Sequence, residues 1–555
     1  MNPIRLRTAA PIVAWSLVAL GVSVPVSGAE YPPPPEREIP APLAGLSDDF
    51  ESILHTYRWP RAHWSVLVVS MDRGDTLFAE APDAPMAPAS NLKLLTTAAA
   101  LRTLGPSFRF RTYLLADGEV REGVLHGDLV LYGTGDPSIS DRLFPDRTEV
   151  FRRLAEQLEA LGIHTITGDL VGDASFLSGP RHPEGWDRKD LNDAFAAPVS
   201  ALSFNENVLS FRVVPSRTAG EAPTVHTIPA RGGMVVVNNA RTVTSRTGPR
   251  LAILRDHPDD AVRIEGRIRK GSRDVWRQMT VSDPALFATL ALRGVLEDRG
   301  ISVIGGSRSV ERRTASVIPA QRRVVAPAMG RKQGSRTRVL ARHESPPLEK
   351  LLEVVNKRSN NLYAELIFRT VGRVRDGVGS EAGAAVAVSD ALVDLGMDPG
   401  DVVQKDGSGL SAESRVSAGF LVDLLRRMEE SPSWPYYWAS LPEAGQRRGL
   451  RRMYQTPAAN NLRAKTGTIQ HVSALSGIVH SSDGERLAFS FLVNSTPSPG
   501  RAKEVENELG ARLASFSRRS GSPLPPGYVA VAQSDDALGS ELTHRGDWVS
   551  ASHHP

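Results

Sequence analysis

Three short polar motifs stand in one order along the chain and carry side chains suited to acyl transfer by a serine. They are Ser90-x-x-Lys93, Ser359-x-Asn361 and Lys465-Thr466-Gly467. Ser90 precedes a helical pattern, so backbone N–H groups and the helix dipole favour a developing alkoxide there. Lys93 lies three residues further on and reaches the same face of that helix. A lysine whose pKa is lowered by burial or by a second cation, for which Lys465 is the candidate, can accept the serine proton.

The second and third motifs carry groups that can hold a peptide. Ser359 and Asn361 stand at the head of an apolar helical pattern, where they can relay a proton and bind a peptide carbonyl. The Lys-Thr-Gly run lies where a strand is expected. Its side chains can bind a terminal carboxylate, and Gly467 lets a substrate backbone approach closely. The proton route, through Lys93 or through a relay of Ser359 and Lys465, stays open at this point.

Each motif has a plainer explanation when it is taken alone. Ser-x-x-Lys also describes a helix whose N-cap is a serine, and Ser203-Phe204-Asn205 repeats the Ser-x-Asn pattern. Strand-like sequence follows Ser203, whereas a long amphipathic pattern follows Ser359, so we prefer Ser359. The three motifs in this order are the set found in serine β-lactamases and penicillin-binding proteins.

Competing chemistries lack their motifs. The sequence contains no His-Glu-x-x-His, Walker loop or Gly-x-Ser-x-Gly elbow, and Gly133-Thr134-Gly135 lacks the third glycine of a dinucleotide loop. The thirteen histidines are scattered, so spacing does not exclude a Ser-His-Asp triad, but no motif supports one. Cysteine is absent, which excludes cysteine nucleophiles, cysteine-ligated zinc, disulfides and a lipid anchor on cysteine.

The composition is that of an ordinary globular protein, with 41% apolar and 23% charged residues. A formal net charge of +4 is small for 555 residues and does not indicate a nucleic-acid partner. Only nine of the 66 basic residues are lysines, so each lysine within a motif is informative.

The N-terminus has the pattern of a secretory signal peptide. Arg5 and Arg7 precede an apolar stretch that ends in small residues, so we expect cleavage after Ala29. An uncleaved membrane anchor is the alternative, but Pro25 and the small residues favour cleavage. No later stretch approaches 18 apolar residues, so we expect no transmembrane segment in the mature protein and a periplasmic or secreted location.

Hydropathy patterning places strands and helices around the motifs. The expected elements are a strand pair turning at residues 72–74, a helix over 91–105, short β-like runs over 111–280 with helices near 148–162 and 283–300, helices again from 340, a hairpin turning at 483–484, and a last helix before 518. Residues 308–338 hold nine basic residues and one glutamate, which predicts a basic surface loop. An anionic polymer is the alternative partner for that loop.

From residue 43 to 517 the chain resembles the penicillin-binding protein 4 type of D-alanyl-D-alanine carboxypeptidase/endopeptidase. Besides the motifs, the resemblance rests on HGDLVLYGTGDPSIS, AAPVSALSFNEN, HESPPLEKLLEVVNKRSNNLYAE, KDGSGLS and NLRAKTGT. The gap of 269 positions from Ser90 to Ser359 is typical of this family, which inserts two domains there. Ordinary serine β-lactamases have their second motif much nearer the first.

The resemblance implies an α/β (α+β) fold: a β-lactamase/transpeptidase-like domain with an antiparallel sheet flanked by helices, interrupted by two β-rich insertions. The expected division is a signal peptide (1–29), a linker (30–42), the transpeptidase-like domain (43–110 and 340–518), a first inserted domain (111–193 and 281–339), a second inserted domain (194–280) and a disordered tail (519–555).

The same resemblance implies that Ser90 forms an acyl-enzyme with release of D-alanine and that water then hydrolyses it. The backbone N–H groups of Ser90 and Thr468 would form the oxyanion hole, and Thr466 and Thr468 would hold the substrate carboxylate. Peptidoglycan stem peptides are the expected substrates and β-lactams the covalent inhibitors. Neither a metal nor a cofactor is implied.

Two positions concern recognition of the peptide side chain. Asp173 resembles a residue of the inserted domain that can meet an amino group, and an ordinary turn aspartate is the alternative. The family commonly has arginine after Gly-Leu-Ser, where this chain has Ala412. Either Arg415 takes the place of that arginine or the substrate is amidated.

We therefore expect a serine-type D-alanyl-D-alanine carboxypeptidase that can also act as a D,D-endopeptidase. A serine β-lactamase, recognised by rapid deacylation, is one alternative. A catalytically idle wall-binding protein is another, but the intact Ser90, Lys93, Ser359 and Lys465 argue against it. The carboxypeptidase and endopeptidase roles and the oligomeric state stay open at this point.

Overall fold

The computed structural model of the chain describes residues 41–57, 59–245, 250–257, 261–318, 337–446 and 450–519. The expected signal peptide (1–29), most of the expected linker (30–40) and the tail from residue 520 lie outside the described residues. The described residues belong to one unit of the chain, which begins at Ala41. None of their helices is long and apolar enough to cross a membrane.

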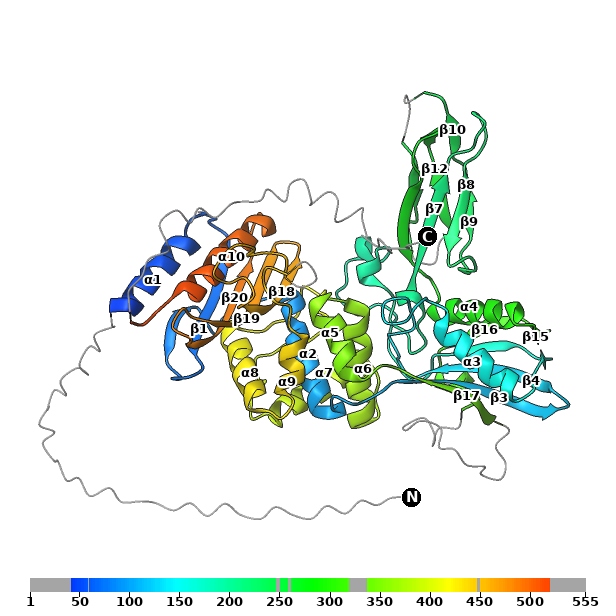
Figure 1. Cartoon of the computed structure of the whole chain (residues 1–555), viewed down its shortest axis with the longest axis horizontal. Helices are drawn as coiled ribbons and strands as arrows, with labels where there is room; N and C mark the ends of the chain where they lie inside the picture. The colour runs from blue at the N-terminus through cyan, green and yellow to red at the C-terminus, as the bar shows by residue number, and fades with distance from the viewer. Residues whose placement is uncertain are drawn as a thin grey trace, which may run out of the picture. The chain divides into compact units, whose positions relative to one another are not determined.

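A five-stranded antiparallel sheet joins segments from both ends of the described chain (Figure 1). Its strands, in spatial order, are β18 (Arg463–Ile469), β19 (Val472–His480), β20 (Arg486–Asn494), β1 (His63–Ser70) and β2 (Thr76–Glu80). Val66 of β1 lies opposite Phe491 of β20, so the N-terminal and C-terminal segments close one sheet. The predicted strand pair at residues 72–74 and the predicted hairpin at 483–484 are confirmed.

Both faces of this sheet are buried. Alternate residues of β20 point to opposite faces. Phe489 and Phe491 belong to the apolar core under α1 (Ala41–Leu54) and α10 (Pro499–Ser515). Ala488 and Leu492 belong to the second core, which includes residues of α8 (Ala418–Glu430). Helices therefore cover the sheet on two sides, as expected for its nearly continuous apolar strands.

Helix α2 (Lys93–Leu104) is a core helix. It contacts α5 (Leu348–Lys357), α6 (Asn361–Asp376), α7 (Glu381–Val393) and α9 (Trp434–Ser440). Every residue from Lys93 to Leu101 is buried, so the helix is enclosed on all sides. Its first residue, a lysine, is consequently held out of water.

A seven-stranded mixed sheet follows the first motif in the sequence. Its strands are β3 (Arg111–Arg121), β4 (Val124–Gly133), β5 (Thr165–Ile166), β6 (Leu170–Asp173), β15 (Ser302–Val303), β16 (Ser307–Val310) and β17 (Thr337–Glu344). Strands β17, β3 and β4 pair antiparallel, while β4 pairs with β5 and β6 in parallel. Helices α3 (Glu149–Ala160) and α4 (Pro284–Asp298) contact its strands.

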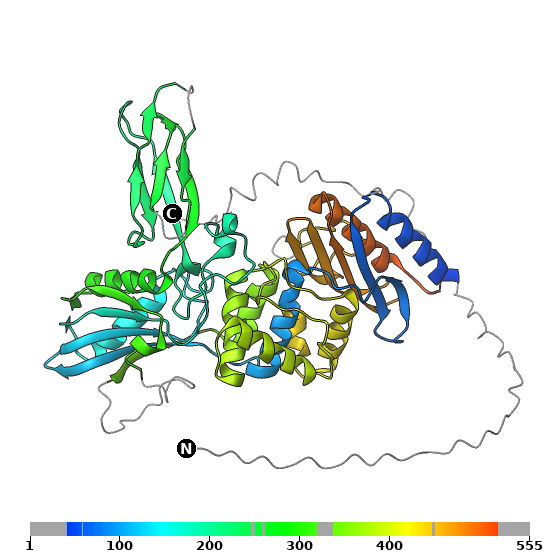
Figure 2. The same cartoon turned by 180° about the vertical axis from the view of Figure 1, so that it is seen from behind.

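A small β region (β7 to β14) lies within this insertion and is drawn in green in Figures 1 and 2. Its strands are β7 (Val208–Val214), β8 (Thr224–Ile228), β9 (Val236–Asn238), β10 (Arg241–Val243), β11 (Ala252–Leu254), β12 (Val262–Glu265), β13 (Arg267–Arg269) and β14 (Val275–Thr280). Strands β14, β7 and β8 form an antiparallel sheet, and the pairs β9–β12 and β10–β13 are parallel.

The structure differs from the expected basic loop at 308–338. Residues 307–310 form strand β16, which pairs in parallel with β6, and Arg308 forms ion pairs with Asp128 and Asp169. Strand β17 begins at Thr337, and residues 319–336 lie outside the described residues. The many arginines of this segment indicated a loop. Ion pairs between Arg308 and acidic residues that are distant in the sequence allow the start of the segment to form a strand. The expected domain boundaries stay a prediction.

Candidate active site

Ser90 lies in a short 3-10 helix, η1 (Ala89–Leu92), directly before α2. The preceding Ala89 has a φ of 45°, in the left-handed region that favours glycine. Two glycines pack on this turn: a Cβ on Gly409 would meet Ala89 O at 1.9 Å, and a Cβ on Gly467 would meet Pro88 O at 2.8 Å. Surrounding backbone therefore holds the strained turn that presents Ser90.

Ser90 is not a helix cap. The N-cap positions of η1 and α2 are Pro88 and Leu92, and neither makes a side-chain capping bond. The Ser90 hydroxyl instead accepts a hydrogen bond of 2.9 Å from Lys93 Nζ. The plainer explanation of Ser-x-x-Lys as a capped helix is thus removed.

Lys93 is fully buried, and its Nζ forms hydrogen bonds with three residues around the nucleophile. Besides Ser90, it donates to Asn361 Oδ1 at 2.7 Å and to Ser408 O at 2.7 Å. Burial lowers the pKa of Lys93 to about 7, although the charges of Asp406 and Glu365 act in the opposite direction. A neutral Lys93 amine has a lone pair 2.9 Å from the serine oxygen and can take its proton.

Lys465, on β18, is also fully buried. Its Nζ donates to Ser359 Oγ at 2.9 Å and to Thr466 O at 2.6 Å. Burial, together with the charge of Lys93, holds the pKa of Lys465 well below its ordinary value. Ser359 has a φ of 51° and immediately precedes Asn360, whose side chain caps α6. The second and third motifs therefore meet through one hydrogen bond, which is the contact that a relay through Ser359 and Lys465 would need.

Asn361 joins the two sides of the site. Its Oδ1 accepts from Lys93, while its Nδ2 donates to Phe195 O at 2.8 Å. Phe195 belongs to η3 (Ala194–Ala196), which comes from the insertion. The amide of Asn361 is therefore oriented by a donor on one side and an acceptor on the other.

The edge strand β18 forms one wall of the site. In the described sheet its only strand neighbour is β19. On its outer side Ala464 N donates to Pro442 O at 3.0 Å, so the outer backbone groups beyond Ala464 are those that can pair with an extended peptide. Thr466 is partly exposed and Thr468 exposed, as a ligand-binding role requires. A Cβ on Gly467 would lie 3.0 Å from Ser90 N, so the strand passes close to the nucleophile.

Sequence reasoning missed a set of contacts made by residues 185–195. Trp186 Nε1 donates to Asp406 Oδ2 at 2.9 Å, and Lys189 Nζ donates to Gln470 Oε1 at 3.0 Å, just beyond β18. Buried Asp406 also accepts from Gly409 N at 2.8 Å and from Ser411 N at 2.9 Å. It thus fixes the loop whose Ser408 carbonyl binds Lys93. The KDGSGLS stretch could have indicated Asp406, but nothing in the sequence indicates Trp186.

Other predicted positions make contacts elsewhere. Asp173 is buried at the end of β6, where it accepts from Ser175 N at 2.8 Å and from the Ser316 hydroxyl. The guanidinium of Arg415 donates to Ala412 O at 2.6 Å and to Ser414 O at 2.8 Å. These hydrogen bonds join Asp173 and Arg415 to residues outside the three motifs.

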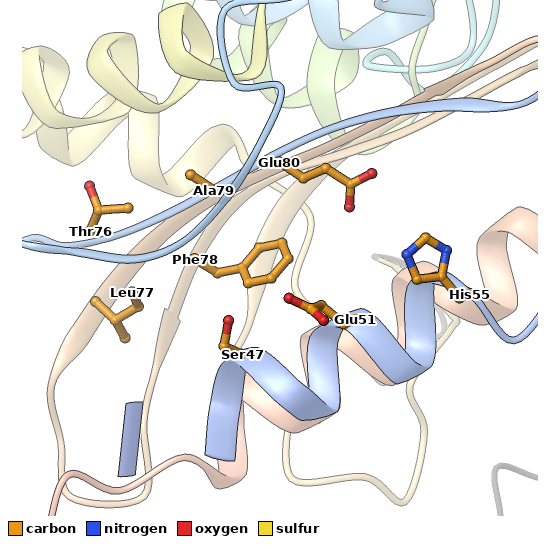
Figure 3. Close-up of a pocket in the computed structure, with 8 residues that line it drawn as sticks. All are labelled: Ser47, Glu51, His55, Thr76, Leu77, Phe78, Ala79 and Glu80. Atoms are coloured by element: carbon orange, nitrogen blue, oxygen red, sulfur yellow. The ribbon is translucent and has the colours of Figure 1, made fainter. Parts of the chain in front are cut away.

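A separate pocket of about 400 Å³ lies between α1 and β2 (Figure 3). Glu51 and His55 of α1 and Glu80 of β2 line it, and burial raises the pKa of Glu80. None of its lining residues belongs to a motif. The pocket lies at the β2 edge of the five-stranded sheet, whereas the third motif lies on β18, at the other edge.

Comparisons with known proteins agree with this geometry. The sequence profile of the D-Ala-D-Ala carboxypeptidase 3 (S13) family matches residues 46–516. Over 491 residues the chain is 32% identical to a D-alanyl-D-alanine carboxypeptidase of Actinomadura sp., covering 86% of each chain. Over 414 residues it is 27% identical to the D-alanyl-D-alanine carboxypeptidase DacB of Haemophilus influenzae, covering 74% of this chain and 80% of that relative.

The fold has a solved counterpart. The crystal structure of penicillin binding protein 4 from Haemophilus influenzae matches with a TM-score of 0.69 at 24% sequence identity, covering 83% of this chain and 97% of that chain. This likeness confirms the predicted α/β fold class. The family match includes all three motifs and the long insertion between the first two. The chain therefore belongs to the D-Ala-D-Ala carboxypeptidase 3 (S13) family and is a serine-type peptidase, as predicted.

Proposed function

We propose that the chain hydrolyses the terminal D-alanyl-D-alanine bond of peptidoglycan stem peptides through an acyl-enzyme on Ser90. The observation that carries this proposal is the 2.9 Å hydrogen bond from Lys93 Nζ to Ser90 Oγ, made by a fully buried lysine. With a pKa of about 7, a large share of Lys93 is neutral near neutral pH, so a base stands beside the nucleophile.

In the acylation step Ser90 Oγ attacks the carbonyl carbon between the two D-alanines while its proton passes to Lys93. The oxyanion that forms is stabilised by the backbone N–H groups of Ser90 and Thr468. The C–N bond then breaks, and the leaving D-alanine takes a proton from Ser359, which Lys465 re-supplies across their 2.9 Å hydrogen bond. Asn361 binds a substrate carbonyl and orients Lys93.

Lys465 couples substrate binding to base strength. Without an anion beside it, two buried lysine charges repel each other, which favours neutral forms. A substrate carboxylate held by Thr466 and Thr468 favours the ammonium form of Lys465. That charge in turn lowers the pKa of Lys93, so binding of a free C-terminal carboxylate favours the basic form of Lys93.

Before the second half-reaction the proton that Lys93 took from Ser90 passes to Lys465, which had given one to Ser359, so both lysines regain their starting forms. Water then attacks the acyl carbonyl while its proton passes to neutral Lys93, and Lys93 returns that proton to Ser90 Oγ as the acyl bond breaks. The same steps cleave a crosslink when the leaving amine belongs to a second stem peptide, which is the D,D-endopeptidase reaction. Within the same proposal, Asp173 binds the amino group of the peptide side chain. Arg415 takes the place of the arginine that is missing at Ala412.

The proposal places the reaction outside the cytoplasm. Residues 1–29 act as a signal peptide and are removed, so the mature chain meets peptidoglycan in the periplasm or outside the cell. β-Lactams imitate the D-alanyl-D-alanine end and acylate Ser90.

The test measures D-alanine released from a synthetic peptide ending in D-Ala-D-Ala. We expect release by the wild-type chain and a loss of at least about 10³-fold in Ser90→Ala. The matched control is Ser203→Ala, in the competing Ser203-Phe204-Asn205 pattern, which should keep activity within about threefold. Loss in Ser203→Ala with retention in Ser90→Ala would overturn the assignment.

A further inference from the structure

Positive charge is concentrated in the small β region. Residues 208–280 contain thirteen basic and six acidic residues, a net charge of +7, whereas the whole chain has +4. The remainder of the chain is therefore slightly acidic. An excess of this size in one segment points to an electrostatic role for its surface.

The topology brings six of these thirteen cations to one end of the region. Val213 of β7 pairs with Val275 of β14, so the loops at residues 215–223 and 270–274 lie at the same end. Hydrogen bonds tie this end together: Ser216 N donates to Thr242 Oγ1 at 3.0 Å, and Lys270 N donates to Val243 O at 2.8 Å. Figure 1 shows β10 at this end.

Six basic side chains form what we call the basic tip: Arg217, Arg241, Arg250, Arg269, Lys270 and Arg273. All six are exposed. Within the described ranges none of the six forms an ion pair. Of the acids on the loops of this end, Asp274 pairs with Arg212, and Glu221 accepts a hydrogen bond from the Ser216 hydroxyl. The six cations of the tip therefore repel one another, and an anion from outside the chain would reduce that repulsion.

An exposed aromatic side chain lies next to the basic tip. Trp276, on the edge strand β14, is 53% exposed, and the guanidinium of Arg212 sits 5.6 Å from the centroid of its ring. Tryptophan beside a cluster of cations is typical of protein surfaces that attach to a membrane interface, where the ring enters the headgroup layer and the cations meet phosphates. A nucleic-acid surface would instead call for several stacking aromatics along a groove.

From this arrangement we propose that the basic tip docks on the surface of a bilayer rich in anionic phospholipid. The interaction is electrostatic and reversible, since each cation near such a surface adds a modest attraction that salt screens. Trp276 adds insertion into the interface. The proposal is independent of the catalytic residues.

The experiment measures co-sedimentation of the chain without residues 1–29 with vesicles. One set contains equal phosphatidylglycerol and phosphatidylcholine, and the other phosphatidylcholine alone. We expect binding to the first set only. Arg269→Glu/Lys270→Glu/Arg273→Glu should weaken it at least about tenfold, and Trp276→Ala about threefold.

The matched control reverses three exposed cations elsewhere, Arg102→Glu/Lys350→Glu/Arg427→Glu, with the same change of net charge. It should reduce binding by no more than about twofold. Equal binding of wild type and tip variant, or equal losses in tip variant and control, would overturn the proposal. Binding of the wild type to soluble polyphosphate but not to vesicles would also overturn it, in favour of an anionic polymer. Unchanged D-alanine release by the tip variant verifies its fold.

Discussion

The catalytic centre and the basic tip both concentrate cations, but the cations of the centre are buried and those of the tip are exposed to solvent. Lys93 and Lys465 are fully buried, and each donates to oxygen atoms of neighbouring residues. Arg269 and Lys270 stand in solvent and form no ion pair in the described part of the chain. Burial lowers the pKa of both catalytic lysines, which makes their charge adjustable.

The choice of residue follows the environment. Arginine keeps its proton at any physiological pH, whereas a buried lysine can lose it. Arginine dominates the small β region as it dominates the whole chain, in which only nine of the 66 basic residues are lysines, yet the two buried cations of the site are both lysines. The difference teaches that burial, and not the presence of cations alone, makes the charge of the site lysines adjustable, whereas the exposed tip keeps its charge.

The largest effect should come from Lys93→Arg, which keeps the charge but removes the base. We expect acylation by penicillin to fall by about 10³-fold, measured by stopped-flow or quenched labelling. At the tip, Lys270→Arg should leave vesicle binding within about twofold. Arginine is larger than lysine and could overpack the buried site. Lys93→Met, which removes the base without adding the larger side chain, is therefore measured beside it, and thermal unfolding checks that both variants are folded. Acylation by folded Lys93→Arg within tenfold of wild type would break the comparison.

Gly467→Ala should have the next largest effect. The added Cβ would meet Pro88 O at 2.8 Å and Ser90 N at 3.0 Å, so strand and nucleophile must separate. A displacement of this kind should slow acylation by about 10²-fold. Gly500→Ala in α10 is the matched control, because its nearest atom lies 3.9 Å away. Similar kinetics in the two variants would show that close approach of β18 is not required.

The pH profile of acylation tests whether the charge of Lys93 changes near neutral pH. Lys93 must be neutral to act as base, so the rate should rise with pH through about 7, the pKa of Lys93. The negative charge of Asp406 raises that pKa, so Asp406→Asn should move the midpoint to lower pH while slowing the plateau rate about tenfold. A midpoint that stays in place or moves upward would contradict this role.

The smallest effect compares two tryptophans. Trp186→Phe removes the hydrogen bond to Asp406, and we expect acylation to slow about fivefold. Trp276→Phe at the tip should leave acylation unchanged. Equal rates for Trp186→Phe and wild type would mean that the insertion does not support the catalytic loop.

Local signals made part of the molecule predictable. The turns at residues 72–74 and 483–484 are marked by Asp and Gly, and the strands beside them pair as expected. The motifs made Ser90, Lys93 and Lys465 candidates because their chemistry depends on residue type, and the structure brings Lys93 Nζ within 2.9 Å of Ser90 Oγ. The long spacing to Ser359 indicated an insertion.

Contacts across the sequence were not predictable. Trp186 and Asp406 are separated by 220 positions, and only the packing of the insertion brings them together. The basic tip was missed for a related reason: net charge averages over the chain, whereas the pairing of β7 with β14 and of β10 with β13 collects cations from several loops. The strand at residues 307–310 likewise depends on a distant partner, β6.

The most direct test of the central claim is peptide mapping by mass spectrometry after a brief exposure to penicillin. We predict a single covalent adduct, located on the peptide that contains Ser90 and absent in Ser90→Ala. An adduct on Ser359 or another serine, or a persistent adduct in Ser90→Ala, would contradict the assignment of Ser90 as the nucleophile.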